Sequence, residues 1–165
     1  MKIAYTLGLG RGETNLVLGT LAEKLKQRGL RLCGTVQTDT ERENEDVCDM
    51  DVSVLPDGPT IRISQTLGPE SRGCRLDPEA LETAVSMTEQ ELAKGADLLI
   101  VNKFGKHEAD GRGFRTVIAA ALEQDVPVLV GANTLNLAAL NSFCDDQAEE
   151  VPADVDALLA WVLKD

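Results

Sequence analysis

A glycine-rich segment near the N-terminus is the part of this chain whose residue types most clearly predict chemistry. It reads Gly-Leu-Gly-Arg-Gly-Glu-Thr over residues 8–14, after the apolar run 3–7 and before a helical pattern that begins near Asn15. A strand, a glycine-rich turn and a helix in this order form a cradle for phosphate, because backbone N–H groups of the turn and of the helix start point at the anion. The residues expected to contact a phosphate or a similar oxyanion here are Gly8, Gly10, Arg11, Gly12 and Thr14.

The segment departs from the Walker A phosphate-binding loop at the position that carries charge. That motif is G-x-x-x-x-G-K-[ST], and its lysine meets the β- and γ-phosphates. Aligning its second glycine on Gly12 places Thr14 in the Ser/Thr position and Glu13 in the lysine position. Leu7 then stands where the first glycine would be. The frame of a nucleotide-binding loop is present, and the charge at its lysine position is reversed.

A second departure follows the apolar run 98–101. In P-loop nucleoside triphosphatases, an apolar strand ends in an acidic residue that helps to hold Mg²⁺. Here the run ends in Asn102 and Lys103. An amide supplies no negative charge to a hard cation, and a lysine repels it. An active enzyme would need relocated groups, with Lys103 or Lys106 stabilising phosphate charge and Glu108 orienting water or a metal.

Positive charge is concentrated in two windows, although the net charge of the chain is −12. The acidic balance argues against general nucleic-acid binding and against attraction to anionic membranes. Seven of the sixteen Lys and Arg residues lie in windows 62–75 and 103–115. If both windows face the glycine-rich loop, they form a basic anion pocket. Its expected binding residues outside the loop are Asn102, Lys106, Arg112, Arg115, Arg72 and Arg75.

The alternative interpretation is that these arginines form surface ion pairs. Such pairs contribute only about 0–1 kcal/mol each. Their acidic partners would be Glu70, Asp77, Glu108 and Asp110. Two further residues are open to a functional or a structural interpretation. Cys74, in its basic setting, is a candidate reactive thiol, and His107, the single histidine, is a candidate for proton transfer.

The elements that must position these residues alternate between strands and helices. We predict strands at 2–7, 30–38, 96–101 and 126–131, and helices at 14–28, 77–94, 114–123, 134–144 and 153–163. A hairpin is expected from 51–55 and 60–64, and loops from 38–49, 65–76 and 102–113. This order predicts an α/β fold in one domain over 1–165: a three-layer sandwich with a mostly parallel central sheet and an inserted β-hairpin. Ligands of such sheets bind beyond the carboxyl ends of the strands.

Composition and termini suggest where the protein works. No apolar run is long enough to span a bilayer, and the N-terminus lacks the pattern of a signal peptide, so we expect a cytoplasmic protein without a membrane partner. The four cysteines contain no C-x-x-C pair, and free thiols are expected. Trp161 and the apolar face of the last predicted helix leave a homodimer possible.

Several runs resemble the bacterial domain-of-unknown-function family DUF2478. The most specific are Arg-Gly-Cys-Arg-Leu-Asp at 72–77 and Asn-Lys-Phe-Gly-Lys at 102–106. The others lie at 10–12, 48–51, 57–59, 61–65 and 111–113. The resemblance covers nearly the whole chain and implies a fold like that of the P-loop nucleoside triphosphatases. Some members of the family occur alongside molybdate transport.

A more distant resemblance is to nucleoside triphosphatases whose second motif is Asp-Glu-Ile-Gly followed by a glutamate. Those positions become Asn102, Lys103, Phe104, Gly105 and Glu108 in this chain, so only the glycine and the last acid match. The expected function is therefore binding or regulation, with a nucleotide or an oxyanion held by a degenerate P-loop. The alternatives are an active NTPase or phosphotransferase that uses a nucleotide with Mg²⁺, molybdate-related oxyanion handling, and an interaction module whose loop no longer binds.

Overall fold

The computed structural model describes residues 1–10, 12–41, 48–65 and 75–165. Arg11, Arg72 and Cys74, which the sequence singled out, lie outside these residues. The elements are β1 (Ile3–Leu7), α1 (Glu13–Gln27), β2 (Leu32–Glu41), β3 (Cys48–Leu55), β4 (Thr60–Arg62), α2 (Pro78–Ala93), β5 (Leu98–Phe104), α3 (Lys106–Ala109), α4 (Arg115–Glu123), β6 (Val128–Ala132), α5 (Leu137–Phe143), β7 (Glu149–Glu150) and α6 (Val155–Leu163).

The strands form one sheet in the order β4-β3-β2-β5-β6-β1-β7. The pairs from β2 through β7 are parallel, and only β3 and β4 run antiparallel to their neighbours. The prediction of a mostly parallel sheet with a hairpin is confirmed. The hairpin of β3 and β4 extends the sheet beside β2, where it forms one edge.

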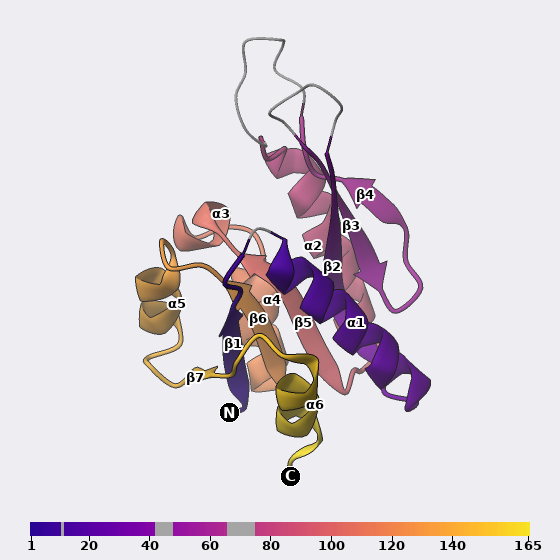
Figure 1. The fold of residues 1–165 in the computed structure, drawn as a ribbon, viewed down its shortest axis with the longest axis vertical. Coiled ribbons are helices and arrows are strands. Elements are labelled where there is room, and N and C mark those ends of the chain that lie inside the picture. Colours follow the sequence, from indigo (N-terminus) through magenta and orange to yellow (C-terminus); the bar gives the residue numbers. More distant parts are fainter. Residues whose placement is uncertain (11, 42–47, 66–74) are drawn as a thin grey trace.

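Helices cover both faces of the sheet, as the predicted sandwich requires. Figure 1 shows α1 and α6 in front of the sheet and α2 and α4 behind it. The side-chain period of two along each strand separates two cores. Ile100 and Leu129 pack with α1 and α6, whereas Val101 and Val130 pack with α2 and α4.

The helix starts follow the local sequence. The Asp77 carboxylate accepts hydrogen bonds from the backbone N–H groups of Glu79 and Ala80, and Pro78 occupies the first helical position of α2, as predicted. α1 begins after Gly12, whose φ of 77° lies in the left-handed region that favours glycine.

The structure differs from the predicted elements mainly at the ends of three strands and in two short elements. β2 extends to Glu41 and β3 starts at Cys48, so both ends of the predicted loop 38–49 are strand. Their polar residues pair across the hairpin from Thr38–Asp51 to Glu41–Cys48, and this pairing overrides their loop-like composition. β5 continues to the fully buried Phe104, and α3 lies within the predicted loop 102–113. The short strand β7 was not predicted.

The expectation of free cysteines holds in part. Cys33 and Cys144 are free and buried, and burial raises the pKa of the Cys33 thiol to about 12, so it stays protonated and unreactive. Cys48 is disulfide-bonded, which contradicts the expectation at that position. Among the described residues, we find no helix with both the length and the hydropathy to cross a bilayer.

Two glycines give a matched test of the packing between β2 and β5. Gly34 has a φ of 108°, and a Cβ there would overlap the carbonyl oxygen of Ile100, whereas a Cβ on Gly19 of α1 would meet nothing within 4 Å. We expect Gly34→Ala to lower the free energy of unfolding by about 2 kcal/mol or more, because backbone strain and overlap add. Gly19→Ala should raise it by up to about 1 kcal/mol. Urea denaturation of both variants measures the difference, and equal effects would contradict the close approach.

Candidate functional site

The glycine-rich loop opens onto a cavity of about 340 Å³ at the carboxyl ends of the parallel strands. β1, β2, β5 and β6 are mutually parallel through their pairings, so their carboxyl ends meet at this edge. Of the residues predicted to form the site, those that line the cavity are Gly8, Gly10, Gly12, Thr14, Asn102 and Lys103. The predicted meeting of the first loop with the end of β5 is thus seen in the structure.

Glycines allow the loop, α1 and the strand ends to come together. A Cβ on Gly8 would overlap Oγ1 of Thr14, in the first turn of α1. A Cβ on Gly131 would overlap the carbonyl oxygen of Asn102 and lie 3.0 Å from Cγ2 of Thr14. Thr14 is therefore held between the loop that precedes it and the end of β6.

The Glu13 carboxylate lies on the glycine-rich loop. Its Oε2 accepts hydrogen bonds from the backbone N–H groups of Leu9, at 3.0 Å, and Gly10, at 2.9 Å. Successive N–H groups that converge on one point form an anion-binding nest, and here the anion is the side chain of the protein itself. Glu13 is the residue aligned with the Walker A lysine. Sequence reasoning recognised the reversed charge but missed the contact with the loop.

A closed ring of four polar side chains connects α1, β2 and β5 at the cavity. The Asn102 Nδ2 group donates to Oδ1 of Asn15, at 2.8 Å, and to Oε1 of Gln37, at 3.4 Å. Asp39 accepts from Nδ2 of Asn15, at 3.0 Å, and from Nε2 of Gln37, at 2.8 Å. Asn102 also accepts the backbone N–H of Gln37 at 3.0 Å. Its amide therefore both donates and accepts, which a carboxylate could not do.

Asp39 is a site residue that sequence reasoning missed. It was assigned to an exposed acidic loop, whereas it lies on the extended end of β2 and lines the cavity. The acidic, polar stretch 38–49 shows no periodicity that would have indicated a strand at Asp39. The carboxylate that borders the cavity thus comes from β2, while β5 contributes an amide.

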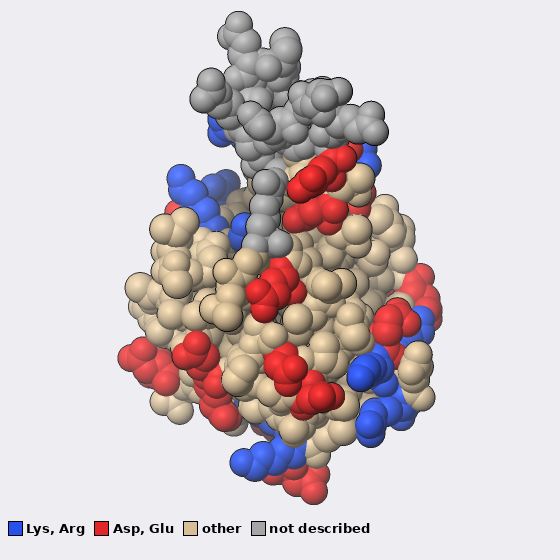
Figure 2. All heavy atoms as spheres, in the orientation of Figure 1, with Lys and Arg blue, Asp and Glu red and all other residues tan. Residues whose placement is uncertain are grey.

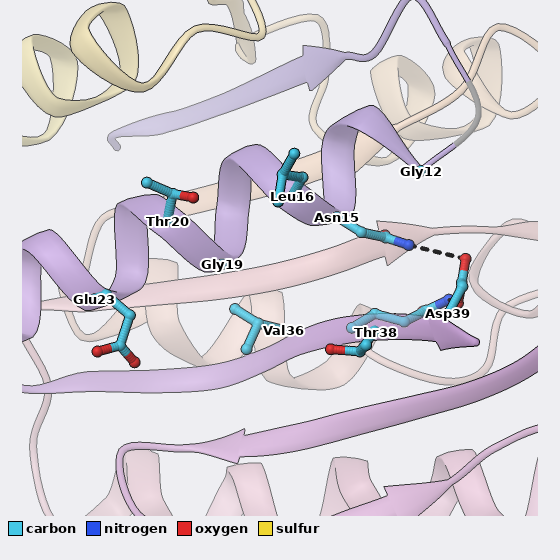
Figure 3. Close-up of a pocket in the computed structure, with 10 residues that line it drawn as sticks. Gly12, Asn15, Leu16, Gly19, Thr20, Glu23, Val36, Thr38 and Asp39 are labelled. Carbon is cyan, nitrogen blue, oxygen red and sulfur yellow. Dashed lines mark hydrogen bonds between the residues drawn. The ribbon is translucent and has the colours of Figure 1, made fainter.

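A second hollow of about 420 Å³ runs between α1 and β2, and we call it the α1–β2 groove. Figure 3 shows its walls: Leu16, Thr20 and Glu23 lie along α1, with the Glu23 side chain extending toward β2, and Val36 and Thr38 lie on β2. Gly12, Asn15, Gln37 and Asp39 line both the groove and the cavity, so the two hollows share a wall.

Most of the predicted basic residues lie away from the cavity. Lys106, Arg112, Arg115 and Arg75 are not among the described residues that line the cavity or the groove. The Arg115 guanidinium lies 4.7 Å from the ring centre of Phe143. Figure 2 shows separate groups of basic side chains on this face, including one over the C-terminal part of α1, among many acidic ones. Within the described part of the chain, Lys103 is the cation that reaches the cavity.

The surface ion pairs of the alternative interpretation are present in part, with other partners. Arg62 pairs with Asp51 at 3.1 Å and with Asp49 at 3.6 Å. Asp77, one of the expected partners, instead caps α2. The first basic window is therefore partly neutralised by β3.

Glu108 is buried beneath the loop around α3. It is 3% exposed, its Oε1 accepts the N–H of Gly105 at 2.9 Å, and its Oε2 accepts the N–H of Phe114 at 3.3 Å. Burial raises the pKa of this carboxyl, and the backbone N–H groups oppose the shift. Both oxygens are engaged in closing the loop, and Glu108 does not line the cavity.

His107 closes the same loop from the other side. Its Nε2 lies 2.7 Å from Oε1 of Glu82, which also accepts the N–H of Gly113 at 2.9 Å. His107 is 7% exposed. The geometry therefore places this histidine in a structural contact between α2 and the loop.

Among the described residues that line the cavity, charged oxygen donors for a cation are scarce. In residues 1–10, 12–41, 48–65 and 75–165, no group of three or more His, Cys, Asp or Glu side chains is placed to hold a metal ion. Of the described lining residues, Thr14 supplies a hydroxyl and Asp39 a carboxylate that suit Mg²⁺, beside the neutral amide oxygens of Asn15, Gln37, Asn102 and Asn133. A magnesium ion held there would need the phosphates of a ligand and water for its remaining positions.

The position of Glu108 predicts a loss of stability when its carboxylate is removed. Glu108→Ala leaves two buried N–H groups without an acceptor, so we expect the free energy of unfolding to fall by about 2–4 kcal/mol. Asp110→Ala, two residues further along the chain and exposed, should change it by less than about 0.5 kcal/mol. Denaturant unfolding measures both variants. A Glu108→Ala variant of unchanged stability that no longer binds ligand would assign Glu108 to the site instead.

Two solved structures resemble this fold. The crystal structure of THEP1 from the hyperthermophile Aquifex aeolicus superposes with a TM-score of 0.65 at 17% identity, over 99% of this chain and 100% of that one. The solution structure of a human cancer-related nucleoside triphosphatase gives a TM-score of 0.59 at 15% identity, over 91% and 87%. These likenesses show the fold of the P-loop nucleoside triphosphatases.

Sequence comparison finds a longer relative and a family. The chain is 29% identical over 160 residues to the molybdenum import ATP-binding protein ModC 2 of Bradyrhizobium diazoefficiens. The match covers 97% of this chain and 18% of that protein, so the chain spans about a fifth of the length of this relative. The model of the family described as protein of unknown function DUF2478 matches residues 3–161, and the chain belongs to this family.

Proposed function

We propose that this protein binds a phosphorylated small molecule, best a nucleotide, at the glycine-rich loop and does not hydrolyse it. One observation carries the proposal: the loop, the start of α1 and Lys103 share a cavity whose β5 wall ends in the amide of Asn102. The first three supply positive potential for phosphate. The amide withholds the acidic group that would help to hold Mg²⁺ for turnover.

Lys103 supplies the positive charge that position 13 lacks. It lies at the end of β5 and lines the cavity, so its ammonium group can reach a phosphate held by the loop. A lysine ammonium is a point charge on a flexible stem, so it can reach the same phosphate from a different strand more easily than the planar guanidinium of an arginine could. The swap of lysine from the loop to β5 preserves phosphate affinity without restoring the Walker A motif.

The α1–β2 groove favours an organic phosphate over a bare oxyanion. Leu16 and Val36 give it apolar walls, and Glu23 and Asp39 place carboxylates in its lining. The Glu23 carboxylate, which lines the groove and not the cavity, repels a second phosphate, whereas it accepts hydrogen bonds from the amino groups of a nucleobase or a similar ring. A ligand with its phosphate in the cavity and its organic part in the groove satisfies both hollows.

The relatives support this proposal and suggest a second one. One structural neighbour is a nucleoside triphosphatase, and the longer relative is named an ATP-binding protein. The longer relative is also named for molybdenum import, which favours molybdate as the alternative ligand. A tetrahedral oxyanion would use the same N–H groups and Lys103, and would leave the groove empty.

The first test removes the cation of the cavity. We expect Lys103→Ala to weaken ATP binding about tenfold or more, because the ligand loses its charge partner. Lys24→Ala, an exposed lysine near the end of α1, makes the same change in net charge and should bind like the wild type. Isothermal titration calorimetry with ATP, GTP, inorganic phosphate and molybdate, each with and without Mg²⁺, measures this. Mg²⁺-dependent release of phosphate from ATP would overturn the non-hydrolysing part of the proposal.

The second test separates a nucleotide from a bare oxyanion. A side chain added at Gly19 projects into open space in the α1–β2 groove, so Gly19→Leu fills the groove and Gly19→Ala barely narrows it. We expect Gly19→Leu to weaken nucleotide binding about tenfold and to leave phosphate and molybdate binding unchanged. If molybdate binds and Gly19→Leu affects no ligand, the oxyanion alternative is the better one.

A further inference from the structure

We propose that Glu13 is a displaceable internal ligand of the glycine-rich loop, and that an external anion binds by taking over the N–H groups that Glu13 holds. This inference rests on the proposed function, since it takes a phosphate as the incoming group. Glu13 then sets how tightly the site binds an external anion and which anions can displace it. The residue therefore determines specificity without belonging to the reacting groups of an enzyme.

The contact has the geometry of a bound anion. A single oxygen, Oε2 of Glu13, accepts the N–H groups of two consecutive residues, at 3.0 Å from Leu9 and 2.9 Å from Gly10. Gly10 itself lines the cavity. An external phosphate seated on the loop would need the N–H of Gly10, and its charge would lie beside the Glu13 carboxylate. Two negative groups cannot share these donors without strong repulsion, so one must leave.

Comparison with Glu108 explains why Glu13 can leave. Both carboxylates hold backbone N–H groups of a glycine-containing loop. Glu108 is 3% exposed and uses both oxygens, so releasing its partners would leave buried groups unpaired. Glu13 lies in the first turn of α1, and its two hydrogen bonds are exposed to solvent. Water can hydrate its carboxylate once it swings outward, so exchange costs little.

The internal ligand has two consequences for the site. It holds Leu9 and Gly10 in their anion-binding arrangement before any ligand arrives, so an external anion does not have to order them. It also sets a threshold, because the incoming anion must outcompete a carboxylate attached to the same chain. A phosphate dianion brings more charge and more acceptor oxygens than Glu13 does, whereas a carboxylate ligand brings no advantage.

The decisive experiment compares Glu13→Gln with the wild-type protein. Glutamine keeps the length of the side chain and an oxygen that can accept the loop N–H groups, so the variant removes the charge and spares the loop. We expect the dissociation constant of inorganic phosphate and of ATP, measured by titration calorimetry on the full chain, to fall at least tenfold. Glu123→Gln, an exposed carboxylate at the end of α4, makes the same change in net charge and should match the wild type.

The outcomes separate this inference from the proposed function. Wild type and Glu13→Gln binding phosphate equally would overturn the inference and leave the proposed function intact. No binding by either protein would overturn both. A tenfold gain that Glu123→Gln reproduces would also count against Glu13, because it would reflect net charge alone.

A second readout follows the exchange in the wild-type protein. Saturating phosphate should shift the amide NMR signals of Leu9 and Gly10 together with the side-chain carboxyl ¹³C signal of Glu13, since donors and acceptor change partners in one step. If Glu13 merely stabilises the start of α1, its carboxyl signal will stay in place as phosphate binds. That result would contradict displacement even if Glu13→Gln changed the affinity.

Discussion

The parallel pairing of β1 with β6 and of β6 with β5 is the constraint on which the site depends. Because three adjacent strands run in the same direction, the glycine-rich loop, Gly131 and Asn102 all emerge at one edge of the sheet. At Gly131, β6 approaches both the carbonyl oxygen of Asn102 and the side chain of Thr14 so closely that a Cβ would overlap the first and crowd the second. A loop that follows β1 and a strand end almost ninety positions later in the chain become opposite walls of one cavity.

Local sequence was sufficient to predict the scaffold, but it was insufficient to predict where the charged side chains lie. Buried apolar runs such as 98–101, the Asp77 cap and the glycine-rich turn after β1 are short-range signals, and the α/β sandwich followed from their order. The basic pocket required knowing which long side chains turn inward, which is decided by tertiary contacts. Lys103 borders the cavity, whereas Arg62 pairs with β3 and Arg115 lies over Phe143.

Glu108 and Asp39 illustrate the same limit, because Glu108 was expected at the site and does not line the cavity, whereas Asp39 was not expected there and does. Glu108 matched the last acid of a distant motif, yet burial and two backbone N–H groups direct its carboxylate into the loop. Asp39 stood in a polar stretch without periodicity, yet the hairpin of β2 and β3 carries it to the cavity. Cross-strand pairing over eight residues could not be read from composition.

The ring of side chains around Asn102 has a mechanical meaning for the sheet. β2 pairs with β5 only from Leu32 to Gly34, while it pairs with β3 as far as Glu41. Just beyond the last backbone pair, Oδ1 of Asn102 accepts the N–H of Gln37, as a peptide carbonyl would. The amide thus connects the paired ends of β2 and β3 to β5, and so to the rest of the sheet. A carboxylate at this position would keep the acceptor and lose both donors that close the ring. Residue 102 therefore serves the continuity of the sheet, and it offers no charged ligand to a cation.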